Sequence, residues 1–284
     1  MSFLEEVVSL TKQAVAKRRE DQSLDELRAS LPIKSDDRSF LRALREPGIS
    51  VIAEFKRSSP SKSALAPPDA LIETYVDEYV RGGARALSIL TEGHFFSGTL
   101  EDLRAARRRT TLPLLRKDFI VDEYQVYEAA QAGADAVLLI AAVLEKDDEL
   151  STLYDLARTL GMDVLLEVRG QTELQRALSL GADLIGINNR NLKTRPSRPR
   201  SFEVDTSRTI KLLQGMPETV TVVAESGLTE RRELDELEAS QVDGALIGSA
   251  LMQAPDRAAK CLELTQAAPD SVDVADARQH ALAS

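Results

Sequence analysis

Histidine and cysteine are scarce in this 284-residue sequence, and their scarcity excludes several kinds of site. Cys261 is the only cysteine, so no disulfide can form within the chain and no metal site can be built from cysteines. With only His94 and His280, the sequence also disfavours a histidine-rich metal site or a Ser-His-Asp relay. Acid–base chemistry therefore falls mainly to glutamate, aspartate and lysine.

Long apolar runs and an excess of basic residues are missing as well. No apolar run reaches the roughly 18 residues of a membrane span, and the net charge of −10 argues against a general nucleic-acid binder. The first residues carry acid where a secretory signal carries base, so we expect a cytoplasmic protein. The composition, 43% hydrophobic and 29% charged, and the length fit one large α/β domain or two small ones.

One phrase recurs along the chain: a helix-like stretch, a glycine, a polar residue and a short apolar run. It occurs at 82–90, 132–140, 180–188 and, more loosely, 242–248. A glycine at this place ends a helix, and the apolar run is typical of a buried strand. With similar runs between the copies, the pattern predicts eight strands, at about 51–55, 86–90, 112–116, 136–140, 163–167, 184–188, 220–224 and 245–248.

Helix-like segments separate these strands, among them 69–81, 123–132, 147–160, 172–180 and 230–237. Alternating strands and helices imply a parallel sheet with right-handed crossovers, and eight such units imply an α/β fold of one (β/α)₈ TIM barrel. An open doubly wound sheet is the structural alternative. It normally carries a glycine-rich turn after its first strand, and that turn is missing here.

The barrel is expected to occupy residues 49–265. Residues 1–48 form a helical N-terminal extension that packs on the barrel, because their apolar residues share one helical face. Residues 266–284 are rich in Ala, Asp and Ser and are expected to form a disordered tail. The basic, proline-containing segment 195–200 is expected to be a solvated loop after the sixth strand.

The first predicted strand carries two charged residues, Glu54 and Lys56, at positions that point to the same side of the sheet. Buried charges are costly unless they are paired or used. A structural ion pair and a functional pair are both compatible with this spacing.

Other strands also end in polar residues, and in a barrel enzyme the catalytic groups lie at the carboxyl ends of the strands. Each residue alone also fits a capping, turn or solvated role. Their convergence at one rim predicts an active site. The residues that converge, besides Glu54 and Lys56, are Lys117, Glu167, Asn188 and Glu225.

Glycine–serine pairs follow the last two predicted strands, as Ser226-Gly227 and Gly248-Ser249. Glycine lets backbone N–H groups approach an anion, and these two loops often bind phosphate in barrels. Two tight turns are the alternative interpretation. The occurrence of both pairs on adjacent strands favours a phosphate site.

The chain resembles the indole-3-glycerol phosphate synthase family from about residue 3 to about residue 260. The resemblance is carried by five motifs in the family's order: 54–61 (EFKRSSPS), 115–120 (LRKDFI), 187–192 (INNRNL), 224–227 (AESG) and 247–252 (IGSALM). It implies a cytoplasmic carboxy-lyase of tryptophan biosynthesis. The implied substrate is 1-(2-carboxyphenylamino)-1-deoxyribulose 5-phosphate, which is converted to indole-3-glycerol phosphate by ring closure, decarboxylation and dehydration.

The resemblance also implies roles for the residues at the rim. Lys117 would be the general acid for ring closure, and Glu167 would act in dehydration with Glu54 and Lys56 assisting. Asn188 and Glu225 would hold substrate hydroxyls and position Lys117. The phosphate would be bound by Ser59, Ser226, Gly227, Gly248 and Ser249, the remaining substrate contacts would be Arg190, Phe96, Leu115, Phe119 and Leu192, and no role is expected for His94.

Beyond the phosphorylated substrate, the resemblance implies no cofactor, no metal, no nucleic acid and no membrane partner, and a monomer or weak homo-oligomer. Two segments depart from the family pattern: the insertion at 195–200 and the loop at 63–68, which is poorer in glycine and polar residues.

Three other functions are alternatives to this one. An isomerase of the same pathway or of histidine synthesis is disfavoured, because it would use Asp or Cys where this chain has Glu54-Phe55-Lys56. A Schiff-base aldolase would need Lys117 deprotonated. Two nearby cations, Arg116 and Lys56, could lower the pKa of Lys117. The charge of the surroundings therefore does not exclude the aldolase. A barrel that has lost activity and serves as a scaffold is disfavoured by the intact set of polar residues.

Overall fold

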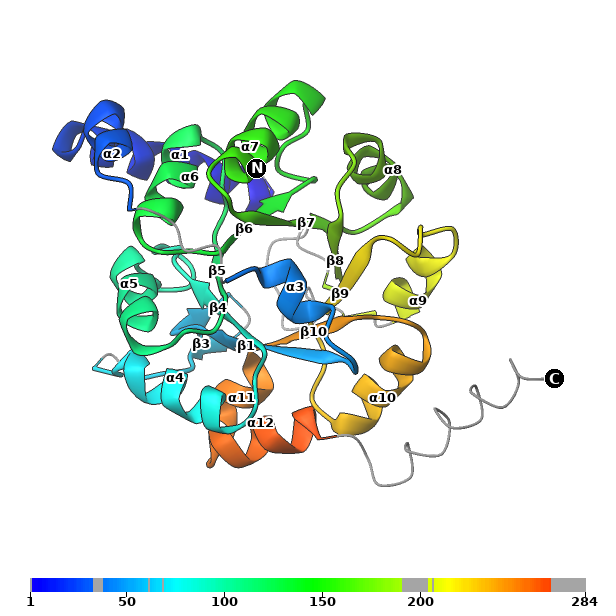
Figure 1. Cartoon of the computed structure of the whole chain (residues 1–284). Helices are drawn as coiled ribbons and strands as arrows, with labels where there is room; N and C mark the ends of the chain where they lie inside the picture. Colours follow the sequence, from blue (N-terminus) through cyan, green and yellow to red (C-terminus); the bar gives the residue numbers. More distant parts are fainter. Residues whose placement is uncertain are drawn as a thin grey trace.

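Eight parallel strands close into a barrel in the computed structural model, which describes residues 2–32, 38–60, 62–67, 69–190, 204–205 and 207–266 (Figure 1). Around the barrel the order is β1-β10-β9-β8-β7-β6-β5-β4. The strands are β1 (Ser50–Phe55), β4 (Ala86–Leu90), β5 (Leu114–Lys117), β6 (Ala136–Ile140), β7 (Asp163–Val168), β8 (Leu184–Asn188), β9 (Thr221–Glu225) and β10 (Gly244–Ile247). The predicted (β/α)₈ barrel is confirmed.

Side chains alternate between the inside and the outside of this barrel. On β1, Ile52 packs in the apolar interior, whereas Val51, Ala53 and Phe55 join the layer between strands and helices. Further along the same inward row comes Glu54, which is also buried. The interior therefore changes from apolar near the amino ends of the strands to charged near their carboxyl ends.

Helices cover the outside of the barrel (Figure 1). They are α4 (Ile72–Arg81), α5 (Leu100–Arg109), α6 (Glu123–Gln131), α7 (Asp147–Thr159), α8 (Gln171–Leu180), α9 (Ser207–Leu213), α10 (Arg231–Ala239), α11 (Ser249–Gln253) and α12 (Arg257–Thr265). The five helices predicted from the sequence are present with slightly different ends. Helix α5 was not predicted because arginines fill much of its length, although Thr99 and Asp102 form a capping box at its start.

Among the described residues before β1, three helices are present: α1 (Phe3–Asp21), α2 (Leu24–Ala29) and α3 (Phe40–Leu44). Helix α3 lies across the amino end of the barrel, in the centre of the view in Figure 1. Its Phe40, Leu41 and Leu44 join the barrel's inner apolar cluster. Asp163 on β7 accepts hydrogen bonds from the Ser39 hydroxyl and from the backbone N–H of Leu41. Polar contacts therefore also attach helix α3 to the barrel.

A short antiparallel hairpin, β2 (Ser58–Ser59) and β3 (Lys62–Ala64), follows β1 and was not predicted. It contacts the loop after β4, because the Ser58 hydroxyl and the Ser58 N–H donate to the carbonyls of Phe95 and Phe96. The predicted loop at 195–200 lies outside the described residues, as does the predicted tail except for Gln266.

Candidate active site

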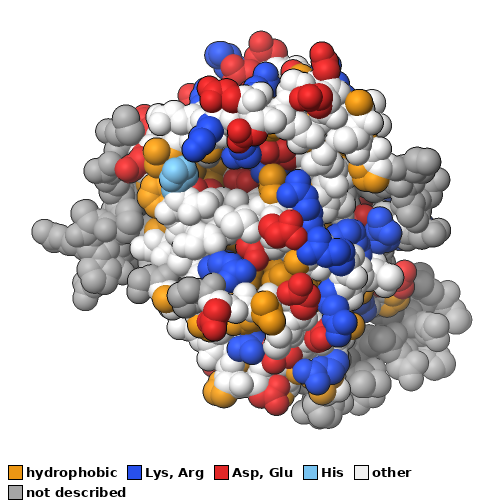
Figure 2. Space-filling model, turned by 90° about the vertical axis from the view of Figure 1, so that its left-hand side faces the viewer, with side chains coloured by type: hydrophobic (Ala, Val, Ile, Leu, Met, Phe, Trp, Pro, Cys, Tyr) orange, Lys and Arg blue, Asp and Glu red, His pale blue; other side chains and the backbone are white. Residues whose placement is uncertain are grey.

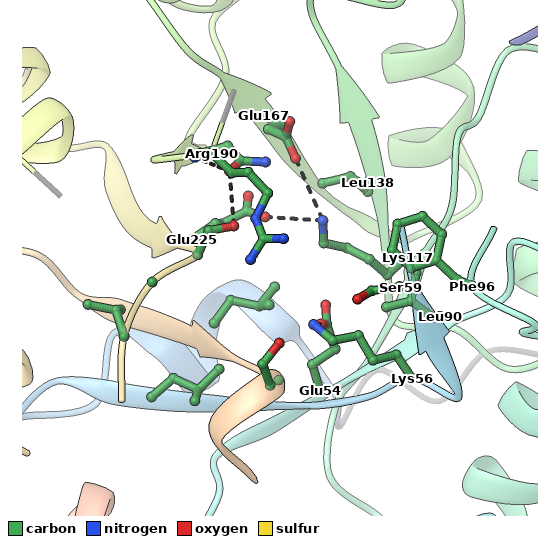
Figure 3. Close-up of a pocket in the computed structure, with 18 of the residues that line it drawn as sticks. Glu54, Lys56, Ser59, Leu90, Phe96, Lys117, Leu138, Glu167, Arg190 and Glu225 are labelled. Atoms are coloured by element: carbon green, nitrogen blue, oxygen red, sulfur yellow. Dashed lines mark hydrogen bonds and ion pairs between the residues drawn. The ribbon is translucent and has the colours of Figure 1, made fainter. Parts of the chain in front are cut away.

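A cavity of about 270 Å³ opens at the carboxyl ends of the strands (Figure 3). It is lined by every residue that the sequence predicted for the site except Leu115 and Leu192. Leu115 lies one step below Lys117 on the inward face of β5 and packs in the barrel core. Leu192 lies outside the described residues. The strand alternation thus brings the predicted charged and polar groups into one cavity.

Lys117 lies between two carboxylates at the end of β5 (Figure 3). Its Nζ is 3.1 Å from Glu225 Oε2 and 3.6 Å from Glu167 Oε2. Burial lowers the pKa of Lys117, but Glu225, Glu167 and Glu54 outweigh burial and raise it above the ordinary value. The ammonium is therefore stably protonated at neutral pH.

Glu54 and Lys56 form the ion pair that their spacing allowed, with Nζ and Oε1 2.5 Å apart. Burial raises the pKa of Glu54, but the neighbouring Lys56 and Lys117 overcome it, so the pKa lies below its usual value. Gly248 on the neighbouring β10 side leaves room for this pair, since a methyl group there would overlap with the Glu54 carboxylate. Glu54 and Lys56 therefore form an ion pair and also line the cavity.

Glu225 has the opposite titration behaviour. Burial raises its pKa to about 7, with Lys117 opposing the shift and Glu167 adding to it. Its Oε1 and Glu167 Oε1 accept no hydrogen bond from the residues that the structure describes. Two buried carboxylate oxygens can therefore receive a proton or a substrate hydroxyl.

Asn188 and Arg190 come from the end of β8 and the loop after it. Asn188 Oδ1 accepts hydrogen bonds from the Arg190 N–H at 2.9 Å and from the Ser226 hydroxyl at 3.1 Å. Figure 3 shows the Arg190 side chain extended across the cavity. Burial lowers the pKa of Arg190, while Glu54 acts in the other direction.

Residues of two loops, after β9 and after β10, line the cavity together with Ser59. Ser226 and Gly227 both have positive φ, at 74° and 92°, a conformation that turns successive N–H groups toward one side. Gly248 and Ser249 line the cavity where α11 begins. These loops are suited to bind an oxyanion.

The apolar side of the cavity includes Phe96 and Phe119, whose ring centroids are 6.4 Å apart. Leu90, Leu138 and Ile140, which were not predicted from the sequence, also line the cavity. Each lies on an inward position of β4 or β6, and this position in the alternation was the signal that could have identified them.

Arg116 lies away from the cavity, which corrects the expectation that it could lower the pKa of Lys117. It points from the opposite face of β5 and is 1% exposed, with Asp118 and Glu128 as ion-pair partners. Successive side chains of a strand point to opposite faces, so sequence neighbours need not share an environment. The three carboxylates inside the barrel decide the charge on Lys117.

Comparisons with known proteins identify the chain's family. The sequence model of the family "Indole-3-glycerol phosphate synthase" matches residues 4–264. The chain belongs to this family. An indole-3-glycerol phosphate synthase of Sulfurimonas denitrificans is 41% identical over 269 residues, covering 92% of this chain and 98% of that protein. One of Micrococcus luteus is 43% identical over 267 residues, covering 91% and 96%.

Solved structures support the fold of this indole-3-glycerol phosphate synthase family member. A 3-hexulose-6-phosphate synthase from Salmonella typhimurium has a TM-score of 0.61 at 13% identity, covering 77% of this chain and 97% of that one. A thiamine phosphate pyrophosphorylase from Pyrococcus furiosus has a TM-score of 0.57 at 19% identity, covering 80% and 96%. At these identities the likeness concerns the fold alone. The family match confirms the expected function class, a carboxy-lyase of tryptophan biosynthesis.

A second hollow lies between α4 and α5 on the outside of the barrel. On the face shown in Figure 2, Lys and Arg side chains gather in a band. The arginines that line the hollow are Arg38, Arg81, Arg107, Arg108 and Arg109. Arg109 pairs with Asp77 and Arg107 pairs with Asp135, at 2.5 and 2.8 Å. Much of the positive charge is therefore balanced locally.

Among the described residues, no group of three or more His, Cys, Asp or Glu side chains is arranged to hold a metal ion. None of the described helices is both long and apolar enough to cross a membrane.

Proposed function

We propose that this site converts 1-(2-carboxyphenylamino)-1-deoxyribulose 5-phosphate to indole-3-glycerol phosphate, carbon dioxide and water. The observation that carries the proposal is the Lys117 ammonium, held by Glu225 and Glu167 at the border between a charged and an apolar cavity wall. Such a border suits a substrate with a benzene ring at one end and a phosphate at the other.

Lys117 acts as the general acid of ring closure in this proposal. As the ring carbon that bears the carboxylate attacks the ketone carbon, the ketone oxygen gains negative charge and takes the Lys117 proton. A forming alkoxide is basic enough to accept a proton even from an ammonium whose pKa is raised. The neighbouring carboxylates keep that proton on Lys117 until the oxygen becomes the stronger base.

Decarboxylation and dehydration follow. The carboxylate leaves as carbon dioxide, and its electron pair neutralises the iminium formed at the nitrogen. The new hydroxyl then leaves as water after it is protonated. A base removes one proton from the ring methylene next to the nitrogen, and the indole becomes aromatic with its N–H retained. Glu167 is placed to exchange these protons, since its Oε1 accepts no hydrogen bond from a described residue, and the Glu54–Lys56 pair assists.

The phosphate is assigned to the backbone N–H groups of Ser226, Gly227, Gly248 and Ser249 and to the Ser59 hydroxyl. Lys56 and Arg190 lie on the same rim and add positive charge. Phosphate oxygens accept hydrogen bonds from backbone N–H groups readily, and positive φ at Ser226 and Gly227 presents those groups. The benzene ring is assigned to the wall that contains Phe96, Phe119 and Leu138.

The proposal extends to the rest of the chain. Residues 1–48 serve as the N-terminal extension of one catalytic barrel at 49–265. The protein acts in the cytoplasm as a monomer or weak homo-oligomer.

Turnover of the named substrate tests the proposal. Purified protein is incubated with the substrate, and indole fluorescence and carbon dioxide release are followed together. Equal amounts of both products support the proposal, and folded protein that forms neither contradicts it. Inactivation by borohydride in the presence of substrate would indicate a Schiff base on a neutral lysine instead. The raised pKa of Lys117 argues against that outcome.

A further inference from the structure

The outward faces of the eight barrel strands are apolar at every position but one. Residues at these positions pack against the helices in the main hydrophobic cluster. They are Val51, Ala53, Phe55, Leu87, Ile89, Leu114, Val137, Leu139, Val164, Leu166, Val168, Ile185, Ile187, Val222, Ala224, Ala245 and Ile247. The exception is Arg116 on β5, which is the largest of the fully buried side chains.

Arg116 uses its whole guanidinium group in this position. Its Nε donates to the Thr91 hydroxyl at 3.1 Å, and Nη1 donates to the carbonyl of Gln125 at 2.6 Å. Its Nη2 donates to Asp118 Oδ2 at 2.9 Å, and both Nη atoms lie 3.3–3.4 Å from Glu128 Oε2. Arg116 thus connects β5 to helix α6 and to the residues just after β4 and β5.

The contacts meet at the residues on either side of Lys117. The Thr91 hydroxyl, just beyond the end of β4, donates to Asp118 Oδ2 at 2.6 Å. Asp118 Oδ1 accepts from the Phe119 N–H at 2.8 Å. Lys117 lies between Arg116 and Asp118 in sequence and points the other way, into the cavity. Any shift of the Arg116 cluster therefore moves the backbone that carries Lys117 and Phe119.

Stability alone gives a weak reason for this cluster. Replacing buried ion pairs by apolar side chains of similar volume is often neutral or stabilising. The remaining outward positions of the strands use that apolar solution. A planar group with five donors, in contrast, fixes the relative positions of several acceptors at once.

We propose that Arg116 is a positioning residue that sets the placement of Lys117 and of the aromatic wall through Asp118 and Thr91. The inference rests on the proposed function of Lys117. Arg116 itself touches no substrate, because it is buried behind the strand.

Arg116→Lys tests this inference because it keeps the charge but cannot reach all four partners. We expect kcat to fall about 100-fold, the scale of a displacement of about 1 Å at a reacting group. The KM should change less than about threefold, since the phosphate site lies on other strands. Steady-state kinetics with the carboxyphenylamino-deoxyribulose phosphate, well below the unfolding temperature, give both values.

Arg107→Lys is the matched control. Arg107 is also mostly buried and pairs with the buried Asp135, which accepts the Leu114 N–H at the opposite end of β5. This variant should lose stability without a change in kcat. An equal fall of kcat in both variants, or an unchanged kcat in Arg116→Lys, would overturn the inference.

Thr91→Val provides a second variant if Arg116→Lys does not fold. It removes the hydroxyl that joins Arg116 to Asp118 and changes no charge. A selective fall in kcat supports the positioning role, and an unchanged kcat contradicts it. These outcomes are read against turnover by the unmodified protein, so failure of the proposed function itself would be seen as absence of product in every sample.

Discussion

Carboxylates and cations lie close together in the cavity. Three carboxylates, from Glu54, Glu167 and Glu225, share it with three cations, from Lys56, Lys117 and Arg190. A fourth carboxylate of the lining, Asp118, is paired with Arg116. An anionic substrate adds negative charge to this set. The pKa of Glu225 is raised, so this carboxylate takes up a proton more readily than an ordinary glutamate when negative charge is added.

The pH dependence of catalysis should report Glu225. Because burial raises its pKa to about 7, Glu225 loses its charge as the pH falls below 7 and no longer pairs with Lys117. We expect kcat/KM to fall on the acidic side with an apparent pKa near 7. In Glu225→Gln that limb should disappear and the plateau should drop about 10- to 100-fold. Rates measured from about pH 5 to about pH 9 check this, and an unchanged acidic limb in the variant would contradict it.

The free energy of unfolding should also depend on Glu225, but in the opposite direction to catalysis: it should fall as the pH rises. Between 4.5, the ordinary value, and about 7, folded Glu225 binds more protons than unfolded Glu225. This residue therefore lowers the free energy of unfolding as the pH rises through that range. Glu225→Gln should remove the decrease, so the variant gains stability relative to the original protein at higher pH. Urea unfolding at several pH values measures this, and parallel curves for the two proteins would exclude the effect.

The small size of Gly186 leaves room for the carboxylate of Glu225. A methyl group there would overlap with Glu225 Oε1 and lie 3.3 Å from a methyl of Leu165. In Gly186→Ala the carboxylate must move from Lys117, and we expect kcat to fall about 10- to 100-fold while the barrel stays folded. Gly170→Ala is the control, since a methyl group there meets no atom within 4 Å. Equal kinetics for both variants would show that the position of Glu225 is unimportant.

At the scale of elements, the sequence predicted strands and their faces wherever a short apolar run or a strand alternation was clear. The eight strands could be predicted because each is a short apolar run, and Glu54 and Lys56 share the cavity because strand positions alternate. Leu138 and Leu115 show the limit, since both are inward leucines and only their height in the barrel separates cavity wall from core. The hairpin β2–β3 was missed because its few residues pair through backbone groups.

Helix α3 should contribute to stability and not to catalysis. Phe40 is fully buried where α3 closes the amino end of the barrel, opposite the cavity. Phe40→Ala should lower the free energy of unfolding by about 3–5 kcal/mol, the usual cost of deleting a buried phenylalanine. Chemical denaturation measures the loss. A kcat that falls at temperatures where the variant is fully folded would show that α3 also influences the site.

At the scale of the whole molecule, the amino end of the barrel contributes stability and the carboxyl end carries the candidate active site. At the amino end, the buried Asp135 is paired with Arg38 and Arg107, and apolar side chains fill the interior. At the carboxyl end, one oxygen of each of two carboxylates, Glu167 Oε1 and Glu225 Oε1, accepts no hydrogen bond from the described residues. Unsatisfied buried polar atoms cost stability, and an active site is where such a cost is retained for chemistry.

The most direct test of the account compares substrate binding and turnover in Lys117→Ala. The account predicts that kcat falls below detection while the dissociation constant of the substrate stays within about tenfold, because phosphate and ring are bound by other residues. Lys146→Ala, which changes an exposed lysine on the α7 side, serves as the control and should keep full activity. Binding lost together with turnover, or turnover retained, would contradict the assignment of Lys117 as the acid.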